Sequence, residues 1–261
     1  MNDFQKKAEI IRVETLTPEV FRFTVHSPAI AAAARPGQFV MVRVEQGNDP
    51  LLPRPFSVHN TESATTFQLL FKIVGRGTSI LADLEVGDRI RVFGPLGRGF
   101  TVSDDGPVCF VAGGMGGAPL FFLAKYLRLN GRRPDRDIVL LGARDQSEVK
   151  PIADDFIRLG YRVETATDDG SMGHHGLVTD LFDGIGPGIV RVYSCGPYPM
   201  MGVVAEKCRQ KNITCEVSVE TIMACGVGAC LGCTILKSDG SYAQVCKDGP
   251  VFTTDKLAWT V

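Results

Sequence analysis

The sequence predicts an antiparallel β-barrel followed by a doubly wound, parallel-sheet α/β domain, with a cysteine-rich ligand loop near the C-terminus. Roughly the first hundred residues hold short runs with partial period-2 alternation and many β-branched or aromatic side chains, which is typical of strands. After about Pro107, strand-like and helix-like patterns alternate, which indicates a parallel sheet with crossover helices. Four of the eight cysteines lie between residues 225 and 246.

The length of 261 residues allows two domains that each bury a core. We expect the barrel domain at residues 1–102, the α/β domain at 103–215 and the cysteine segment at 216–261. The last segment is too short for an independent core, so we expect it to pack against the other two.

Charge and hydropathy exclude several kinds of partner. The net charge of −1 predicts no polyanion-binding surface, so nucleic acid is not expected. No window approaches the ~20 apolar residues of a membrane span. The stretch MNDFQKKAEI lacks the apolar run of a signal peptide, and we expect a cytoplasmic protein with no membrane contact. Because the cytoplasm keeps thiols reduced, the eight cysteines favour metal or cluster ligation over a disulfide framework.

The expected elements follow in order along the chain. Barrel strands are expected at 8–16, 20–27, 37–45, 66–74 and 88–96. In the second domain, strands are expected at 108–114, 137–144, 161–170 and 188–197, and helices at 119–129, 148–160 and 199–211. A C-terminal hairpin would pair 234–237 with 243–246.

The first candidate binding motif is RPFS in LLPRPFSVHN, with Arg54, Pro55, Phe56 and Ser57. A guanidinium presents a planar set of donors suited to phosphate, and proline limits the backbone beside it. A serine hydroxyl both donates and accepts, as the edge of a flavin ring requires. The alternative is that so short a pattern occurs by chance.

A glycine-rich segment follows in FKIVGRGTSIL, where Gly75 and Gly77 flank Arg76 and precede Thr78. Glycines permit close approach of the backbone to a diphosphate, and a helix starting at Thr78 would offer it free amides. A simple turn with a helix cap is the alternative.

The second domain opens with a glycine turn in FVAGGMGGAPL, at Gly113, Gly114, Gly116 and Gly117. Between a strand and a helix, such a turn lets a dinucleotide pyrophosphate meet backbone amides. The pattern departs from G-x-G-x-x-G because its sixth position is Pro119. A tight strand-to-helix connection is the alternative.

A further segment, YSCGPYPMM, places Cys195, Gly196 and Pro197 at the carboxyl end of a predicted strand. Open α/β sheets bind ligands at that edge. A buried cysteine without a chemical role is the alternative.

Nucleotide selectivity has weaker signals. Asp168 and Asp169 could accept hydrogen bonds from a ribose, although a solvated turn is the simpler interpretation. Except for Arg144, no cation stands out as a partner for a 2′-phosphate, so NAD is favoured over NADP. The sequence does not settle the choice between NAD and NADP. The histidines His59, His174 and His175 are expected to be polar turn residues without a chemical role.

The cysteines in MACGVGACLGC and beyond have the spacing C-x4-C-x2-C-x12-C, at Cys225, Cys230, Cys233 and Cys246. The first three match the spacing of plant-type [2Fe–2S] ligands. Small residues between them leave backbone amides free to donate to sulfur. Zinc and disulfide chemistry are the alternatives, but structural zinc sites commonly pair two C-x2-C units and only one is present here. The cysteines outside this pattern are expected to pack in the core: Cys109, Cys208 and Cys215.

The chain resembles the ferredoxin–NADP reductase superfamily in four segments, which occur in the order RPFS, GRGT, AGGMGGAP and CGPYPM. The resemblance implies an FAD-binding barrel, with Arg54, Gly77 and Thr78 at the FAD diphosphate and Phe56 and Ser57 near the flavin ring. Here proline occupies the second position of the family's R-x-[YF]-[ST] signature. Other residues implied along the FAD are Pro55, Phe71, Lys72 and Ile73.

The same resemblance implies a pyridine-nucleotide site in the second domain. The superfamily uses its own G-x-G-x-x-P version of the glycine turn, which implies that Gly113, Gly114, Gly116 and Gly117 bind NAD. Its C-G-P segment lies near the nicotinamide and the flavin. The residues implied there are Cys195, Gly196 and Pro197.

With the four cysteines included, the chain closely resembles the electron-transfer subunits of class 1B dihydroorotate dehydrogenases. That family implies a [2Fe–2S] cluster on Cys225, Cys230, Cys233 and Cys246, and an FMN-containing catalytic subunit as partner. It also implies a heterotetramer with two copies of each subunit, and electron flow from FMN through the cluster and FAD to NAD⁺. Some relatives replace the first cysteine with aspartate, whereas this chain keeps Cys225.

Two alternatives stay open for the function. Hydride transfer moves two electrons at once, whereas an iron–sulfur cluster takes one. A flavin can do both, so FAD is a chemically sensible cofactor between NAD and the cluster. Because no clear general base for an organic substrate is evident, substrate oxidation is expected on another polypeptide. That polypeptide could belong to a different redox complex, with ferredoxin, hydrogenase or sulfur chemistry. The alternative of another class is a non-enzymatic, zinc-binding interaction module.

Overall fold

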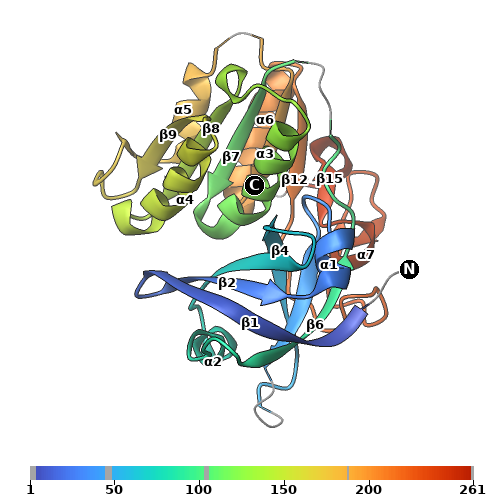
Figure 1. Ribbon diagram of the computed structural model, residues 1–261. Helices are drawn as coiled ribbons and strands as arrows, with labels where there is room; N and C mark the ends of the chain where they lie inside the picture. The colour runs from blue at the N-terminus through green and yellow to red at the C-terminus, as the bar shows by residue number, and fades with distance from the viewer. Residues whose placement is uncertain (1–3, 45–48, 103–105, 187, 260–261) are drawn as a thin grey trace.

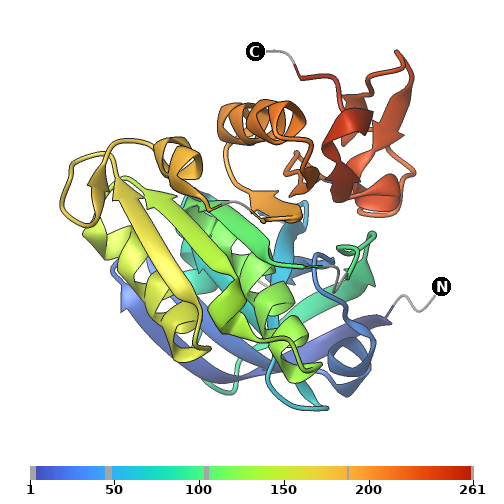
Figure 2. The same cartoon turned by 90° about the horizontal axis from the view of Figure 1, so that it is seen from above.

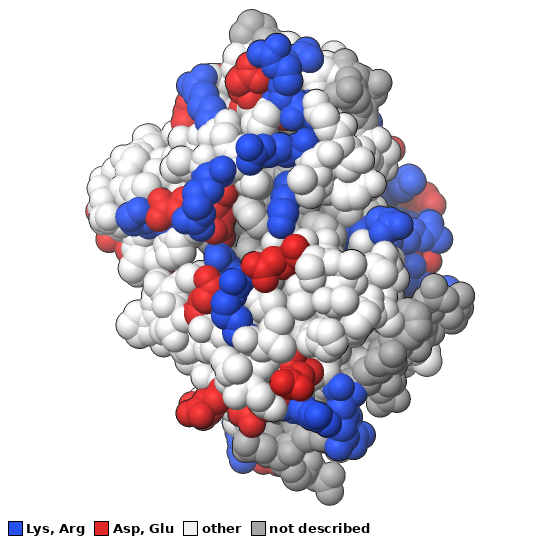
Figure 3. Space-filling view, viewed as in Figure 1, with Lys and Arg blue, Asp and Glu red and all other residues white. Residues whose placement is uncertain are grey.

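The computed structural model describes residues 4–44, 49–102, 106–186 and 188–259. It confirms the predicted fold class, with a closed antiparallel barrel and a parallel-sheet α/β domain. The two lie one above the other in Figure 1, and the C-terminal segment lies beside both of them. Acidic and basic side chains are interspersed on the face shown in Figure 3, in keeping with the net charge of −1.

Six of the described strands close into the barrel, in the order β1-β2-β5-β4-β3-β6. Their bounds are β1 Phe4–Thr17, β2 Val20–His26, β3 Phe39–Val44, β4 Arg54–Thr61, β5 Thr66–Lys72 and β6 Arg89–Leu96. Alternate side chains such as Phe23, Val25, Phe67 and Leu69 fill the interior and are fully buried. Strand β4 was not expected, because its proline and polar residues hide the alternation of this strand.

Two short helices border the barrel, α1 (Pro28–Ala33) and α2 (Arg76–Ala82). Helix α2 begins two residues before the expected Thr78. The Thr78 hydroxyl accepts hydrogen bonds from the amides of Val74 and Gly75, at 2.9 and 3.1 Å. This residue therefore closes the turn that leads into the helix.

Seven of the described strands form the second sheet, in the order β10-β9-β8-β7-β11-β12-β15. Their bounds are β7 Val108–Gly113, β8 Ile138–Ala143, β9 Arg162–Thr167, β10 His174–His175, β11 Arg191–Cys195, β12 Thr214–Ser218 and β15 Val251–Thr253. The helices are α3 Gly117–Leu129, α4 Gln146–Arg158, α5 Val178–Leu181 and α6 Tyr198–Gln210. Helices α3 and α4 cover the sheet face that is turned toward the barrel, whereas α5 and α6 cover the opposite face (Figure 2).

The C-terminal segment contains the expected hairpin, in which β13 (Thr234–Leu236) pairs with β14 (Tyr242–Gln244). Helix α7 (Val245–Asp248) follows, and β15 then joins the α/β sheet antiparallel to β12. Strand β12 crosses the expected boundary between residues 215 and 216. The three expected domain ranges stay a prediction. The C-terminal segment shares a hydrophobic core with its neighbours, as its short length requires.

The expectation of polar turn residues is wrong for His174 and His175, which form the short, exposed strand β10, and also for His59. It lies in β4, 1% exposed, and its ring stacks on Phe121 of α3 with ring centroids 4.7 Å apart. Burial lowers its pKa to about 3, with help from the Arg22 charge. His59 therefore belongs to the contact between the barrel and α3. Among the described residues, none of the helices has the length and apolarity needed to span a bilayer.

Candidate cofactor and nucleotide sites

A pocket of about 250 Å³ lies between the barrel and the α/β domain. Six of the residues expected at FAD line it together: Pro55, Phe56, Ser57, Phe71, Lys72 and Thr78. Residues 218–221, at the end of β12 and just beyond it, line it from the other domain, together with Met223. Arg54, Ile73 and Gly77 are not part of its lining.

Arg54 lies next to the pocket, against the first turn of α2. A Cβ atom on Gly77 would overlap the Arg54 guanidinium, so this glycine leaves room for the guanidinium in its present position. The guanidinium donates a hydrogen bond to the carbonyl of Leu52. On the pocket side, the Thr221 hydroxyl is buried and has no described hydrogen-bond partner. An aromatic and aliphatic lining with an unsatisfied hydroxyl, beside an arginine, fits a flavin ring with a diphosphate.

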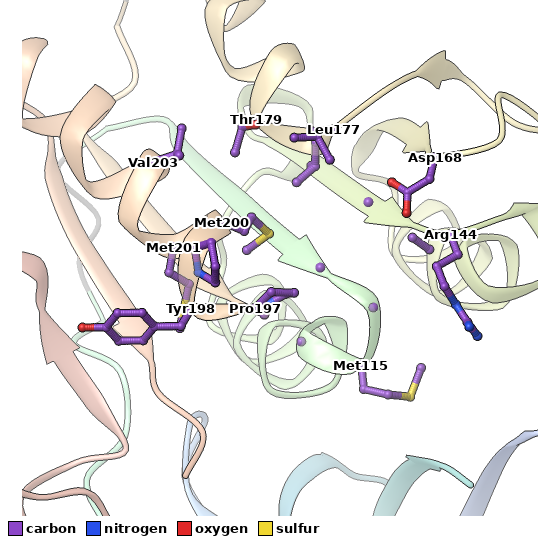
Figure 4. A pocket seen from close by; sticks show the side chains of 18 of the residues that line it. Met115, Arg144, Asp168, Leu177, Thr179, Pro197, Tyr198, Met200, Met201 and Val203 are labelled. Carbon is purple, nitrogen blue, oxygen red and sulfur yellow. The ribbon is translucent and has the colours of Figure 1, made fainter. Parts of the chain in front are cut away.

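A larger pocket, of about 750 Å³, lies at the carboxyl edge of the parallel sheet (Figure 4). Five of the residues expected at NAD line it: Gly113, Gly114, Gly116, Gly196 and Pro197. Gly117 and Cys195 lie behind this lining. Burial raises the pKa of the Cys195 thiol well above its usual value, so the thiol stays protonated at neutral pH.

The glycine turn packs directly on the C-G-P segment. A Cβ on Gly116 would overlap the carbonyl oxygen of Cys195, and a Cβ on Gly113 would lie 2.7 Å from Pro197 Cδ. Gly117 has a packing role, because its Cβ would lie 2.5 Å from the Ile152 side chain. The glycines are thus needed for close backbone contact at the bottom of the pocket.

Both pockets are lined by two residues that were not expected at either site, Met115 and Glu220. They mark the place where the two pockets meet. Glu220 is exposed to solvent in the cleft. Protein atoms nevertheless surround its carboxyl group closely, and this partial desolvation raises its pKa. Nothing in the local sequence VSVET singles this residue out, since its position depends on how β12 meets the barrel.

The opposite end of the larger pocket is polar, with Arg144, Glu148 and Asp168 in its lining (Figure 4). Asp169 is not in this lining. The Ser171 hydroxyl and amide donate to it at 2.7 and 2.9 Å and lower its pKa. Of the two aspartates considered for ribose binding, only Asp168 therefore faces the cavity.

The four cysteines of the ligand loop form two pairs. The Cys233 and Cys246 sulfurs lie 3.2 Å apart and are buried. The Cys230 thiol is hydrogen-bonded to the Cys225 sulfur nearer the surface. Leu231 has a φ of 62°, an unusual conformation for leucine, and its carbonyl accepts a hydrogen bond from the Thr234 amide in the turn that carries Cys233.

Backbone amides point at these sulfurs. Val227 and Cys230 donate to the Cys225 sulfur at 3.5 and 3.4 Å, and Gly228 donates to Cys246 at 3.0 Å. Burial opposes ionisation of Cys225, but the amides lower its pKa to about 6. Burial and the adjacent Cys233 raise the pKa of Cys246 to about 12, an effect that a bound cation would reverse.

The arrangement of the thiols bears on which metal they suit. Structural zinc sites commonly pair two C-x2-C units, and this loop contains one, at Cys230 and Cys233. Two thiol pairs beside free amides fit a cluster of two irons, each of which takes two thiolates. The donor set of the loop therefore fits [2Fe–2S] better than zinc.

The cysteine loop is joined to the smaller pocket through strand β3. A Cβ on Gly226, whose φ is 72°, would lie 2.7 Å from Met41 Cγ. Two residues earlier on the same strand, Phe39 lines the smaller pocket. The chain from Met223 to Cys225 makes a second connection. The three candidate sites are therefore contiguous, from cysteine loop to smaller pocket to larger pocket.

Comparisons with known proteins agree with this arrangement. Residues 7–100 match the family described as the oxidoreductase FAD-binding domain. Residues 220–258 match the iron–sulfur cluster binding domain of dihydroorotate dehydrogenase B. The chain thus has both an FAD-binding and a cluster-binding domain, as the resemblance implied.

Full-length relatives extend the match to nearly the whole chain. The dihydroorotate dehydrogenase B (NAD(+)) electron transfer subunit of Desulforamulus reducens is 39% identical over 260 residues, 97% of each chain. That of Clostridium acetobutylicum is 39% identical over 224 residues, which cover 85% of this chain and 86% of the relative. A solved structure of an NADH-dependent reduced ferredoxin-NADP oxidoreductase aligns with a TM-score of 0.87 at 32% identity, over 97% of this chain and 90% of that one. The chain therefore belongs to the family of electron transfer subunits of dihydroorotate dehydrogenase B (NAD(+)).

Proposed function

We propose that this chain carries electrons from an FMN-containing dihydroorotate dehydrogenase subunit to NAD⁺, through a [2Fe–2S] cluster and FAD. The observation that carries the proposal is the contiguity of the cysteine loop, the smaller pocket and the larger pocket. Met41 and Phe39 join the first two, and Met115 and Glu220 join the last two. Electron transfer requires such a continuous series of sites.

The residues of each site have separate tasks in this proposal. The cluster ligands are Cys225, Cys230, Cys233 and Cys246. Those proposed for FAD are Arg54, Pro55, Phe56, Ser57, Phe71, Lys72, Ile73, Gly77 and Thr78. Those proposed for NAD are Gly113, Gly114, Gly116, Gly117, Cys195, Gly196 and Pro197. When bound, FAD exchanges a hydride with nicotinamide and single electrons with the cluster.

The partner is proposed to cover the cysteine loop. Apolar side chains are exposed on and beside this loop, at Ile222 (86%), Val227 (44%) and Leu231 (61%). Exposed apolar groups around a redox centre support an interface with another subunit. A heterotetramer with two copies of each subunit is part of the proposal, and the expected cytoplasmic location stays a prediction.

A second candidate is a flavo-iron–sulfur subunit of another redox complex. It is favoured by the 32% identity to the NADH-dependent ferredoxin-NADP oxidoreductase chain. The two candidates share the fold and all three sites, so they differ only in the electron partner.

The test uses the chain purified anaerobically from its host together with its bound partner. Dihydroorotate and NAD⁺ are added, and NADH is followed by absorbance. We expect NADH formation that requires a co-purifying FMN subunit. A brown preparation that NADH reduces, but that shows no activity with dihydroorotate, would contradict the substrate assignment and favour the second candidate.

A further inference from the structure

The larger pocket has an acidic lining. Its charged lining residues, within the part of the chain that is described, are one cation, Arg144, and three carboxylates, Glu148, Asp168 and Glu220. A ligand group with two negative charges would therefore depend on Arg144 for a favourable contact.

The position of Arg144 indicates which part of a dinucleotide it would meet. Glu220 and Met115 lie where the larger pocket joins the smaller one, so the nicotinamide must bind at that end to reach the flavin. The glycine turn after β7 occupies the middle. Arg144 and Asp168 follow β8 and β9, which lie on the other side of β7 from β12 in the sheet order, and the adenosine ribose would lie beside them.

Arg144 is held by a carboxylate of its own domain. Its Nε donates to Glu148 Oε1 at 2.9 Å, and its Nη2 donates to the same oxygen. Glu19 lies 4.0 Å from Nη2. Hydrogen bonding to Glu148 accordingly raises the pKa of Arg144.

Glu148 is itself fixed from a second side. Lys72 Nζ lies 2.5 Å from Glu148 Oε1 and 3.2 Å from Glu19 Oε2. Arg144, Glu148, Lys72 and Glu19 thus form a closed ring of alternating charges across the two domains. The Glu148 side chain is only 12% exposed and is held by both cations, whereas the Arg144 side chain is 65% exposed.

We propose that Glu148 makes the larger pocket select NAD over NADP, because it occupies the Arg144 guanidinium. This inference rests on the proposed binding of NAD in that pocket. The 2′-phosphate of NADP would meet the Asp168 carboxylate and a guanidinium whose charge Glu148 already offsets, and would lose its hydration for a weakened contact with Arg144. The 2′-hydroxyl of NAD can instead donate to Asp168.

The test compares two fragments as inhibitors of NADH oxidation by the FAD-loaded complex, with an artificial two-electron acceptor. Adenosine 2′,5′-bisphosphate carries the extra phosphate, and 5′-AMP does not. In Glu148→Gln, the inhibition constant of the bisphosphate should fall at least about tenfold relative to that of 5′-AMP, the effect of one charge-assisted hydrogen bond. The ratio of kcat/KM for NADPH to that for NADH should rise in parallel.

Matched variants show whether the gain, meaning the tighter binding of the bisphosphate relative to 5′-AMP, depends on Arg144. Adding Arg144→Gln to Glu148→Gln should abolish the gain. Asp154→Asn removes an exposed carboxylate of the same helix, paired with Lys150, and should leave both inhibition constants unchanged.

The inference is overturned if Glu148→Gln, with its FAD retained, discriminates as the wild type does, or if the gain persists without Arg144. Should Glu148→Gln fail to fold, Arg144→Gln alone decides. Because Arg144 is occupied in the wild type, that variant should keep the wild-type ratio of the two inhibition constants, and a tenfold change would overturn the inference. Failure of 5′-AMP and NADH to bind the wild type would instead contradict the proposed function.

Discussion

The Lys72 ammonium lies 2.5 Å from the Glu148 carboxylate, and this ion pair joins the barrel to the α/β domain. Lys72 lines the smaller pocket and Glu148 lines the larger one. A second bridge, from Arg22 of β2 to Asp155 of α4, is buried at the same interface. The relative position of the two pockets is thus fixed by charged groups as well as by apolar packing.

Removal of the Lys72 charge should weaken the contact between the domains. Lys72→Met leaves Glu148 partly buried without this partner, so the free energy of unfolding should fall by about 1–2 kcal/mol. FAD release should accelerate, since Lys72 lines the smaller pocket. Urea unfolding and the rise of free-flavin fluorescence measure the two effects. In the control, Lys150→Met breaks an exposed pair with Asp154 and should change neither; equal losses in both variants would contradict the account.

Gly116→Ala should damage the nucleotide pocket by a steric effect. The backbone at Gly116 is helical, with a φ of −58°, so alanine suits its conformation, but the added Cβ would overlap the Cys195 carbonyl. We expect a loss of about 1–3 kcal/mol in unfolding free energy and a higher KM for NADH. Gly184→Ala is the control, because its Cβ would meet nothing within 4 Å. An unchanged KM in Gly116→Ala would show that the turn does not hold the nucleotide.

His59 should make stability depend on pH. Burial lowers its pKa from 6.5 to about 3, so the folded protein keeps the ring neutral while the unfolded chain protonates. This contribution is complete above pH 6.5 and is lost as pH falls toward 3, at about 1.4 kcal/mol per pH unit. The Arg22 and Lys125 charges act in the same direction, whereas the hydrogen bond to Ala118 opposes them.

The measurement is the slope of unfolding free energy against pH between 4.5 and 6, from urea titrations. In His59→Gln, proton uptake on unfolding should fall by about one relative to the wild type. His174→Gln, which removes an exposed histidine, is the matched control. Equal effects of the two substitutions would show that His59 is not held neutral.

Cys230→Ser should separate the two halves of the electron path. Transfer from the partner subunit to NAD⁺ should be abolished, whereas NADH oxidation by artificial two-electron acceptors should continue. Anaerobic assays of the purified complex measure both rates. In the control, Cys208→Ser alters a buried core cysteine outside the loop and should retain coupled turnover. Full coupled turnover in Cys230→Ser would exclude this route.

Sequence patterns predicted the order of the elements but not every contact. The barrel and the alternating α/β elements follow from hydrophobic periodicity, because each buries one face. Strand β4 was missed, since Pro55, Ser57, His59 and Asn60 interrupt the pattern. Tertiary contacts decide there: His59 and Asn60 are buried, His59 against α3 and Asn60 through a hydrogen bond to Gln68.

The candidate sites were predictable where a motif lies in one segment. The glycine turn and the cysteine spacing are local, so Gly116 and Cys225 were identified directly. Glu220 and Glu148 were not, because their positions depend on contacts between segments far apart in sequence. The pairing of Glu148 with Lys72 spans 76 residues and appears only once the domains are packed.

The most direct test of the central claim is an anaerobic reductive titration of the purified complex with NADH, followed by EPR, with iron, zinc and acid-labile sulfide determined on the same sample. We predict about two irons and two sulfides per copy of this chain, and a cluster EPR signal that appears as NADH is added. Cys230→Ser should lose that signal but keep a flavin that NADH bleaches. Bound zinc without sulfide, or a flavin that NADH reduces with no cluster signal, would contradict the assignment of the cysteine loop to electron transfer.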